Sequence, residues 1–442
     1  MFETCNNIEQ QQQSIWPVVH SPLGLLQPNP IEESNRISLS HSHLAPSPTQ
    51  TLAHPPPNHD RAMAAPPPEL MEELIGEIIL RLPPDEPEHL FRAALVCKPW
   101  LRVLCDTAFR RRYRVFHGAP PLLGLLHKRQ VLEGDPPTRF ASTTSLPDFP
   151  HPGSDGHRTR PLDCRHGRVL IHMLEDESVD YLVWDPITGD KHRLPEPDIE
   201  WLIYSAAVLC AVDGCDHLDC HGGPFRVVFV ATHDYKDTIL ATVYSSETGA
   251  WSVPVSLDNG CESYVQHMRD GRAERSWYTP YLQPSRGTLI GDEIYFTVRR
   301  GNTIIKYDWR NNGVAMVNSP SPNVYYIALM VMEDSSLGFA CIQDSSLLTW
   351  SSKVNSEGDT EWVQCRVIEL GTIIPGHEPL VVGSAEGVGV IFICSDAGLF
   401  TIELKSGRVR KVDEPGVYFS VLPYMSFYTP DRGRLLSLAR AN

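Results

Sequence analysis

Short runs of β-prone residues, separated by turn residues, fill this chain from about residue 118 onward. Val, Ile, Tyr, Phe and Trp dominate these runs, as half-buried pleated surfaces require. No long amphipathic helix interrupts them, so parallel βαβ units are disfavoured and an antiparallel all-β architecture is predicted. The clearest predicted strands are Arg168–Ile171, Tyr181–Trp184, Arg226–Val230, Ile239–Tyr244, Glu293–Val298, Thr303–Tyr307, Leu380–Val382, Val388–Cys394 and Leu399–Leu404.

A turn of the same chemistry recurs among these strands. Trp184–Gly189 and Tyr244–Gly249 each place Asp or Ser directly after an aromatic strand end, with a glycine four residues further on. Asp and Ser side chains can hydrogen-bond the turn backbone, and glycine adopts positive φ without strain. Looser copies end at Gly313, Gly358 and Gly407. The copies lie roughly 45 to 65 residues apart, and a period near 40 to 50 with four strands per unit is the signature of β-propeller blades.

The repeat also predicts how many blades there are. Five such turns, together with strands expected at residues 118–145 and 417–428, indicate about six blades. The two ends of the region would then share one blade and close the ring. A β-sandwich or two smaller sheets are the alternatives. Aromatic residues at the repeated turns are expected to pack inside the blades rather than to stack on ligands, and these are Trp184, Tyr244, Trp251, Tyr307 and Trp309.

The first 68 residues have a different composition. They are rich in Pro, Ser, Gln, His and Asn, so they are predicted to be a disordered tail that cannot bury a core. Gln10–Gln13 stand where a secretory signal would have an apolar core. No apolar stretch is long enough to span a membrane. The formal net charge of −16 disfavours binding to nucleic acid. An intracellular protein with reduced cysteines is expected, in the cytoplasm or the nucleus.

Residues 69–105 read as two or three short helices. Leu70, Leu74, Ile78 and Leu82 are four residues apart, with Ile79 beside them, and so form one apolar stripe. A second apolar set runs from residue 90 to residue 104. Some forty residues cannot bury this much apolar surface among themselves. A partner that covers the stripe is therefore expected.

This segment resembles an F-box. The resemblance is carried by Leu74–Leu82 with Pro83, by Leu90–Ala94, by Leu95–Lys98 and by Trp100. Together with Phe109–Arg114 and Pro120–Gly124, it is similar to the large plant F-box group that has a β-rich C-terminal part. The segment departs from the family at Glu69–Met71, where Leu-Pro is usual, and at Pro99, which a helix tolerates in its first turn. The alternative is a helical hairpin that packs only on the rest of the chain.

After the disordered tail that the composition predicts at residues 1–68, the resemblance implies an all-α F-box at 69–117 and an all-β target-recognition domain at 118–442, and so a multi-domain protein. It implies the substrate-recognition subunit of an SCF-type E3 ubiquitin ligase, joined to a cullin through a Skp-type adaptor and binding an unidentified target protein. No catalytic motif is recognised, so neither enzymatic activity nor a cofactor is expected. The family positions that contact the adaptor correspond to Leu74, Ile78, Ile79, Leu82, Pro83, Leu95, Val96 and Trp100.

A stretch rich in Cys and His is the second chemical feature of the chain. Cys210, Cys215, His217, Cys220 and His221 could ligate zinc, which takes tetrahedral Cys/His sets. Their spacing fits no familiar paired-ligand finger, and Cys210 continues an apolar strand, so a loop without metal is favoured. A metal site with Cys215, His217, Cys220 and His221 as candidates, and a redox site, remain open. A metal-binding or enzymatic propeller and a lectin-like binder are the corresponding alternatives to a ligase receptor.

Overall fold

The structure is a computed structural model. It describes residues 71–130, 138–145, 159–174, 179–233, 238–257, 266, 281–283, 285–299, 303–318, 327–354 and 360–430. The chain divides into two compact units, Met1–Pro67 and Pro68–Asn442, and every described residue belongs to the second. The predicted tail at residues 1–68 lies outside the described residues, so the fold concerns the second unit alone.

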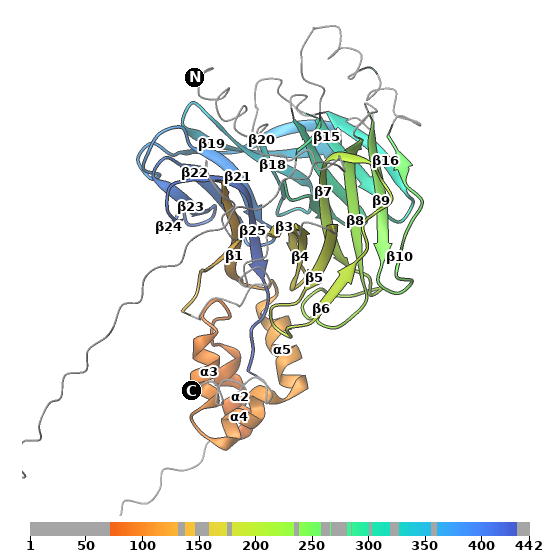
Figure 1. Ribbon diagram of the computed structural model, residues 1–442. Coiled ribbons are helices and arrows are strands. Elements are labelled where there is room, and N and C mark those ends of the chain that lie inside the picture. Colours follow the sequence, from red (N-terminus) through yellow and green to blue (C-terminus); the bar gives the residue numbers. More distant parts are fainter. Residues whose placement is uncertain are drawn as a thin grey trace, which may run out of the picture. The chain divides into compact units, whose positions relative to one another are not determined.

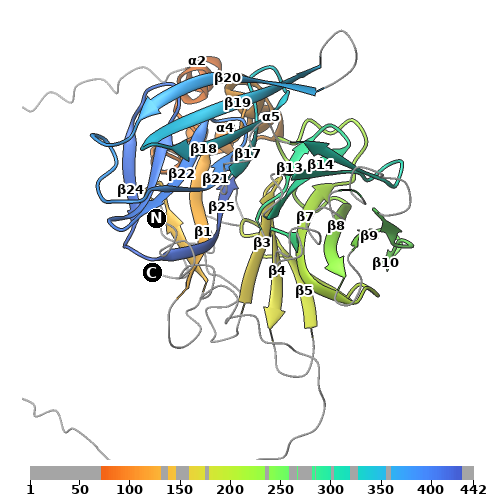
Figure 2. The same ribbon diagram turned by 90° about the horizontal axis from the view of Figure 1, so that it is seen from above.

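Six antiparallel sheets form the β part of this unit (Figure 1) and are arranged around a ring (Figure 2). The chain therefore folds into a six-bladed β-propeller, as the sequence repeat predicts, and not into a sandwich. Seven of the nine strands singled out above fall within observed strands, and the other two, Val388–Cys394 and Leu399–Leu404, overlap β22 and β23 but extend past them by one or two residues. The first blade contains β3 (Thr159–Arg165), β4 (Arg168–Leu174), β5 (Val179–Trp184) and β6 (Lys191–Leu194). The second contains β7 (Trp201–Cys210), β8 (Phe225–His233), β9 (Ile239–Ser245), β10 (Ala250–Trp251) and β11 (Val255–Ser256).

The next three blades follow in chain order. The third contains β12 (Tyr281–Leu282), β13 (Thr288–Ile290), β14 (Glu293–Arg299), β15 (Thr303–Asp308) and β16 (Gly313–Asn318). The fourth contains β17 (Ile327–Val331), β18 (Leu337–Gln343), β19 (Ser346–Val354) and β20 (Thr360–Glu369). The fifth contains β21 (Leu380–Ala385), β22 (Val390–Ser395), β23 (Gly398–Glu403) and β24 (Val409–Asp413).

The sixth blade is built from both ends of the propeller sequence. β25 (Val417–Met425) pairs antiparallel with β1 (Leu122–Gln130), and β1 pairs with β2 (Arg139–Ser142). In the register, Leu126 lies opposite Leu422. β25 also contacts β21 of the fifth blade and β3 of the first. The predicted closure of the ring by the two ends is confirmed.

The repeated turn joins the third and fourth strands of a blade. Gly189, Gly249 and Gly407 have φ of 80°, 68° and 69°, a conformation that glycine adopts without strain. Each donates its backbone N–H at 2.8 Å to the carbonyl oxygen four residues earlier, on Asp185, Ser245 and Glu403 respectively. Two of the predicted copies differ: at the β15–β16 turn the left-handed residue is Asn312 (φ 51°) rather than Gly313, and Gly358 lies outside the described residues.

Four charged side chains meet between blades, two of them fully buried (Asp163 and Arg165) and two largely shielded from solvent. Asp163 on β3 accepts hydrogen bonds from Arg165 and from Arg286, which precedes β13. Both guanidiniums also contact Glu386, which follows β21. Two positive and two negative charges thus balance one another out of solvent, as buried ions require. Asp163 further accepts the N–H of Val208 at 2.9 Å, so the network connects the first, second, third and fifth blades.

Within the described part of the chain, four helices precede the propeller: α2 (Glu72–Leu80), α3 (Glu88–Ala94), α4 (Lys98–Cys105) and α5 (Thr107–His117). Pro99 lies in the first turn of α4, where its missing donor costs nothing. Asp106 caps α5 by accepting the N–H of Phe109 at 2.8 Å. The helical core contains Ile75, Ile79, Leu80, Leu90, Ala93, Ala94, Leu104 and Tyr113, together with Phe427 from the segment after β25. None of the described helices is long and apolar enough to cross a bilayer.

Candidate functional site

Exposed apolar side chains concentrate on the helical segment. Among the described residues, seven of the twelve large apolar side chains that are exposed lie between positions 71 and 116. On α2, Leu74 is 47% and Ile78 46% exposed, while the other side of this nine-residue helix is buried. At the junction of α3 and α4, Leu95 is 79% and Val96 62% exposed. A short helix that is apolar on both sides needs a second covering surface.

The eight predicted adaptor residues do not all reach this surface. Leu74, Ile78, Pro83, Leu95 and Val96 are exposed. Leu82 and Trp100 are half-buried and pack against the helical core. Ile79 is fully buried in that core. Helical geometry explains the last case, because Ile79 shares a face with Ile75, four residues earlier, and this face packs against α4 and α5. In this conformation Ile79 offers no surface to a partner.

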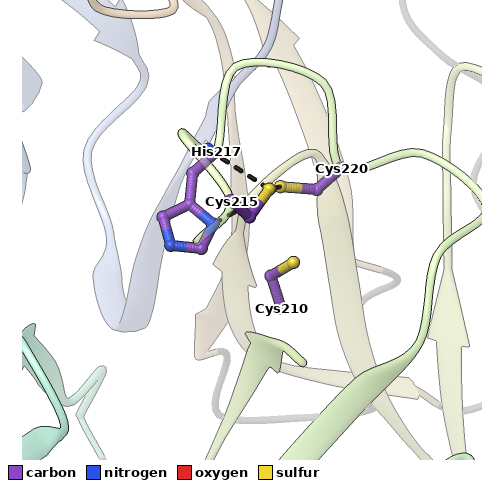
Figure 3. Close-up of side chains that lie close together, drawn as sticks. All are labelled: Cys210, Cys215, His217 and Cys220. Carbon is purple, nitrogen blue, oxygen red and sulfur yellow. Dashed lines mark hydrogen bonds between the residues drawn. The ribbon is translucent and has the colours of Figure 1, made fainter. Parts of the chain in front are cut away.

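A second site lies on blade 2. We call the four residues Cys210, Cys215, His217 and Cys220 the Cys/His cluster (Figure 3). Their ligand atoms, three sulfurs and an imidazole nitrogen, all lie within 4.8 Å of one another. Cys210 is the last residue of β7, and the other three belong to the 211–224 loop that leads to β8. His221, a sequence candidate, is not a member.

Local backbone and ring contacts hold the cluster. His217 has a left-handed backbone conformation, with φ of 58°, and its backbone N–H donates to Cys215 Sγ at 3.4 Å. Its ring stacks on that of His166, with centroids 4.0 Å apart. His166 Nδ1 in turn accepts the N–H of Cys210 at 3.2 Å. Burial, together with His217 and nearby arginines, lowers the pKa of His166 to about 2, so this ring stays neutral.

The sulfurs differ in how readily they ionise. A hydrogen bond from Cys220, with further ones from His217 and Cys215, lowers the pKa of the Cys210 thiol to about 3. The same contact with Cys210, together with burial and charge repulsion from Cys210 and Cys215, raises the pKa of Cys220 well above its ordinary value. Of these two thiols, Cys210 is therefore the one that ionises more readily, and Cys220 keeps its proton.

His221 serves a different contact. Its Nδ1 lies 2.5 Å from Oδ2 of Asp185, the residue whose side chain also caps the β5–β6 turn. Its Nε2 lies 3.5 Å from the hydroxyl of Ser426. His221 therefore bonds the loop to blade 1 and to the end of β25. The sequence makes His221 a candidate metal ligand because it directly follows Cys220. It favours Cys210 less, because the apolar residues before Cys210 suggest an ordinary strand residue.

The loop that carries the cluster also contacts the helices. Leu218 packs against the helical core, and the Asp219 carboxylate pairs with the Arg114 guanidinium of α5. A hollow of about 560 Å³ lies along this contact, lined by Arg110 of α5, Asp216 of the loop and other residues of both. The basic run from Arg110 to Arg114 is expected to be either a solvated face or an interdomain contact. Arg114 makes the second kind of contact.

Comparison with known proteins adds only distant similarities. No family model matches this sequence, and no curated protein does. A nidogen/laminin complex structure is 12% identical over 69% of this chain and 99% of the matched chain, with a TM-score of 0.40. TolB from Acinetobacter baumannii is 13% identical over 71% and 70%, with a TM-score of 0.37. Virginiamycin B lyase from Staphylococcus aureus is 13% identical over 58% and 74%, at 0.30. None of these carries an argument about what this chain does.

Proposed function

We propose that this protein is the substrate-recognition subunit of an SCF-type E3 ubiquitin ligase. The observation that supports the proposal is the exposed apolar surface formed by Leu74, Ile78, Leu95 and Val96, on helices that already have a core of their own. Exposed apolar surface of this kind marks a protein-binding site. The F-box-like order of the same residues gives the partner its identity, a Skp-type adaptor that leads to a cullin.

In this proposal the two parts of the chain divide the work. The exposed side of α2 and the α3–α4 junction bind the adaptor, and the propeller binds a target protein. The receptor supplies proximity rather than chemistry, because holding a target beside the transfer centre raises its effective concentration. Proximity requires the two parts to keep a fixed geometry. Phe427 in the helical core and the Arg114–Asp219 pair are contacts that favour such a geometry.

A binding measurement on the full chain tests the proposal. The double variant Ile78→Ala, Leu95→Ala removes two exposed anchors, and each should contribute about 2 kcal/mol if it lies at an interface centre. We expect affinity for a purified Skp-type adaptor to fall by about 4 kcal/mol in total, close to a thousandfold. Trp100 is unsuitable for this purpose because it also packs against the helical core.

Val253→Ala is the matched control, since Val253 is 81% exposed on the propeller and its loss should leave adaptor affinity unchanged. Both variants should melt at the wild-type temperature. The proposal fails if the wild-type chain does not bind the adaptor, or if the double variant binds it as tightly as the wild type.

A further inference from the structure

The Cys/His cluster has the spacings of a tetrahedral metal site. Zinc holds sulfur at about 2.3 Å and imidazole nitrogen at about 2.05 Å, so a tetrahedron separates two sulfurs by roughly 3.8 Å and sulfur from nitrogen by roughly 3.6 Å. Cys215 Sγ and Cys220 Sγ lie 3.6 Å apart, and Cys220 Sγ lies 3.5 Å from His217 Nδ1. Cys220 Sγ thus already has the required separation from two other ligand atoms. Cys210 projects toward them from the end of β7 (Figure 3), within 4.8 Å of the others.

Apolar packing does not account for this convergence. Free cysteines usually gather because they are buried among other apolar side chains. Here His217 is exposed and Cys215 half-buried. Neighbouring contacts also fix the orientation of the ligands. The His217 ring stacks on the His166 ring, and the backbone N–H of His217 points at Cys215 Sγ. Metal sites commonly orient their ligands through such surrounding contacts.

We propose that Cys210, Cys215, His217 and Cys220 bind one Zn²⁺, and that this ion fixes the 211–224 loop against the helical segment. Three soft thiolates and one imidazole select zinc among the common divalent ions. Four protein ligands fill the tetrahedron and leave no open position for a substrate, so the ion is structural. The thiols release their protons to solvent as the metal binds.

The contacts of the 211–224 loop show which part of the protein the ion would stabilise. Leu218 and Asp219 stand between the ligands His217 and Cys220. Leu218 packs on the helical core and Asp219 pairs with Arg114 of α5. An ion that fixes both flanking ligands also fixes these two side chains. Zinc would therefore stabilise the attachment of the helices to blade 2, a role independent of adaptor binding.

Metal content of the full-length protein tests the site. Protein purified under reducing conditions with added Zn²⁺, then desalted, should contain one zinc per chain by mass spectrometry of the metal. Cys220→Ser should lower zinc affinity at least about tenfold. Cys365→Ser, at an exposed cysteine of β20, and His221→Gln, at the histidine beside the cluster, should retain one zinc.

A titration of the wild-type apoprotein with Co²⁺ covers the case in which Cys220→Ser does not fold. Sulfur-to-cobalt charge transfer and the intense visible bands of tetrahedral cobalt are expected. Absence of both zinc and cobalt binding would overturn the proposal. So would a Cys215–Cys220 disulfide in the reduced preparation, because a disulfide removes two ligands.

Hydrogen exchange tests the role of the ion. Chelation should speed amide exchange in α5 and in the 211–224 loop, and leave β22 and β23 of the fifth blade unchanged. Asp219→Asn should speed exchange in α5 while retaining one zinc, because it removes the ion pair but no ligand. If chelation leaves exchange in α5 unchanged, the ion does not hold the helices.

Discussion

Arg286 donates its Nε–H to Oδ1 of Asp163 at 3.0 Å, across 123 residues of sequence. The Asp163 side chain is completely buried, and that of Arg286 is only 12% exposed. Arg165, two residues from Asp163, donates to the other carboxylate oxygen, also at 3.0 Å. One carboxylate therefore links the first strand of blade 1 to the start of blade 3. Glu386 of the fifth blade neutralises the remaining charge.

Replacing Asp163 with alanine should strongly destabilise the propeller. The change leaves two buried guanidiniums facing one carboxylate and deprives the Val208 N–H of its acceptor. Removing one partner from a buried ion pair costs about 3–5 kcal/mol. The free energy of unfolding, measured in urea, should fall by that amount. Asp180→Ala, which breaks the exposed pair with Arg193, should cost at most about 1 kcal/mol. Equal effects of the two changes would contradict the role assigned to the network.

The buried histidine His172 should make stability depend on pH. Burial, and to a lesser degree Arg160, lowers the pKa of His172 to about 3, from an ordinary 6.5. Between these values the unfolded chain binds a proton that the folded chain does not, so the free energy of unfolding falls as the pH falls from about 6.5 toward 3. This one group contributes a slope of up to about 1.4 kcal/mol per pH unit.

His172→Gln should remove that part of the slope, measured by urea unfolding at a series of pH values. Tyr204→Phe is the control, because it deletes only the hydroxyl that hydrogen-bonds His172 and leaves the ring buried. It should retain most of the slope. A histidine variant with the same slope as the wild type would show that His172 is protonated alike in both states.

Closure of the ring should depend on β25. Deleting residues 418–442 removes the strand that pairs with β1 and contacts β21 and β3. The exposed edges invite association between chains, so the shortened chain should be found in the insoluble fraction. Deletion of residues 431–442 keeps β25 and should leave the protein in the soluble fraction. Size-exclusion chromatography and thermal melting of the two deletion variants test this expectation. A variant without residues 418–442 that is monomeric and melts cooperatively would contradict the closure argument.

Two adjacent residues of α2 should have opposite phenotypes. Ile79 is fully buried, and Ile78 is 46% exposed. Ile79→Ala creates a cavity in the helical core and should cost about 2–5 kcal/mol of stability in the helical segment. Ile78→Ala should leave stability nearly unchanged and weaken adaptor binding. Hydrogen exchange of α2 to α5 reports the first effect, and calorimetric titration with the adaptor reports the second. Loss of binding from Ile79→Ala without loss of stability would place Ile79 at the interface instead.

The blades follow from local chemistry, which the sequence contains in full. Alternating β-branched and aromatic residues favour strands, and a glycine with positive φ is needed at the turn, so Gly189, Gly249 and Gly407 mark blades before any contact is known. The sequence also shows that α2 has more apolar residues than one buried face requires. Helical spacing alone, however, did not predict that Ile78 is exposed and Ile79 buried. Burial depends on which face α4 and α5 cover.

Other features were decided only when distant segments met. β3 contains Pro161, Asp163 and Arg165, a composition typical of loops, and it was not among the strands that the sequence predicted. Those charges can be buried only because Arg286 and Glu386 arrive from more than a hundred residues away. Cys210 is a local case of the same kind: it reads as an apolar strand residue, and only the fold of the following loop brings His217 and Cys220 beside it. A buried charge or a ligand set is defined by its partners in space, and the sequence pattern does not specify which side chains a loop or the closed ring will bring together.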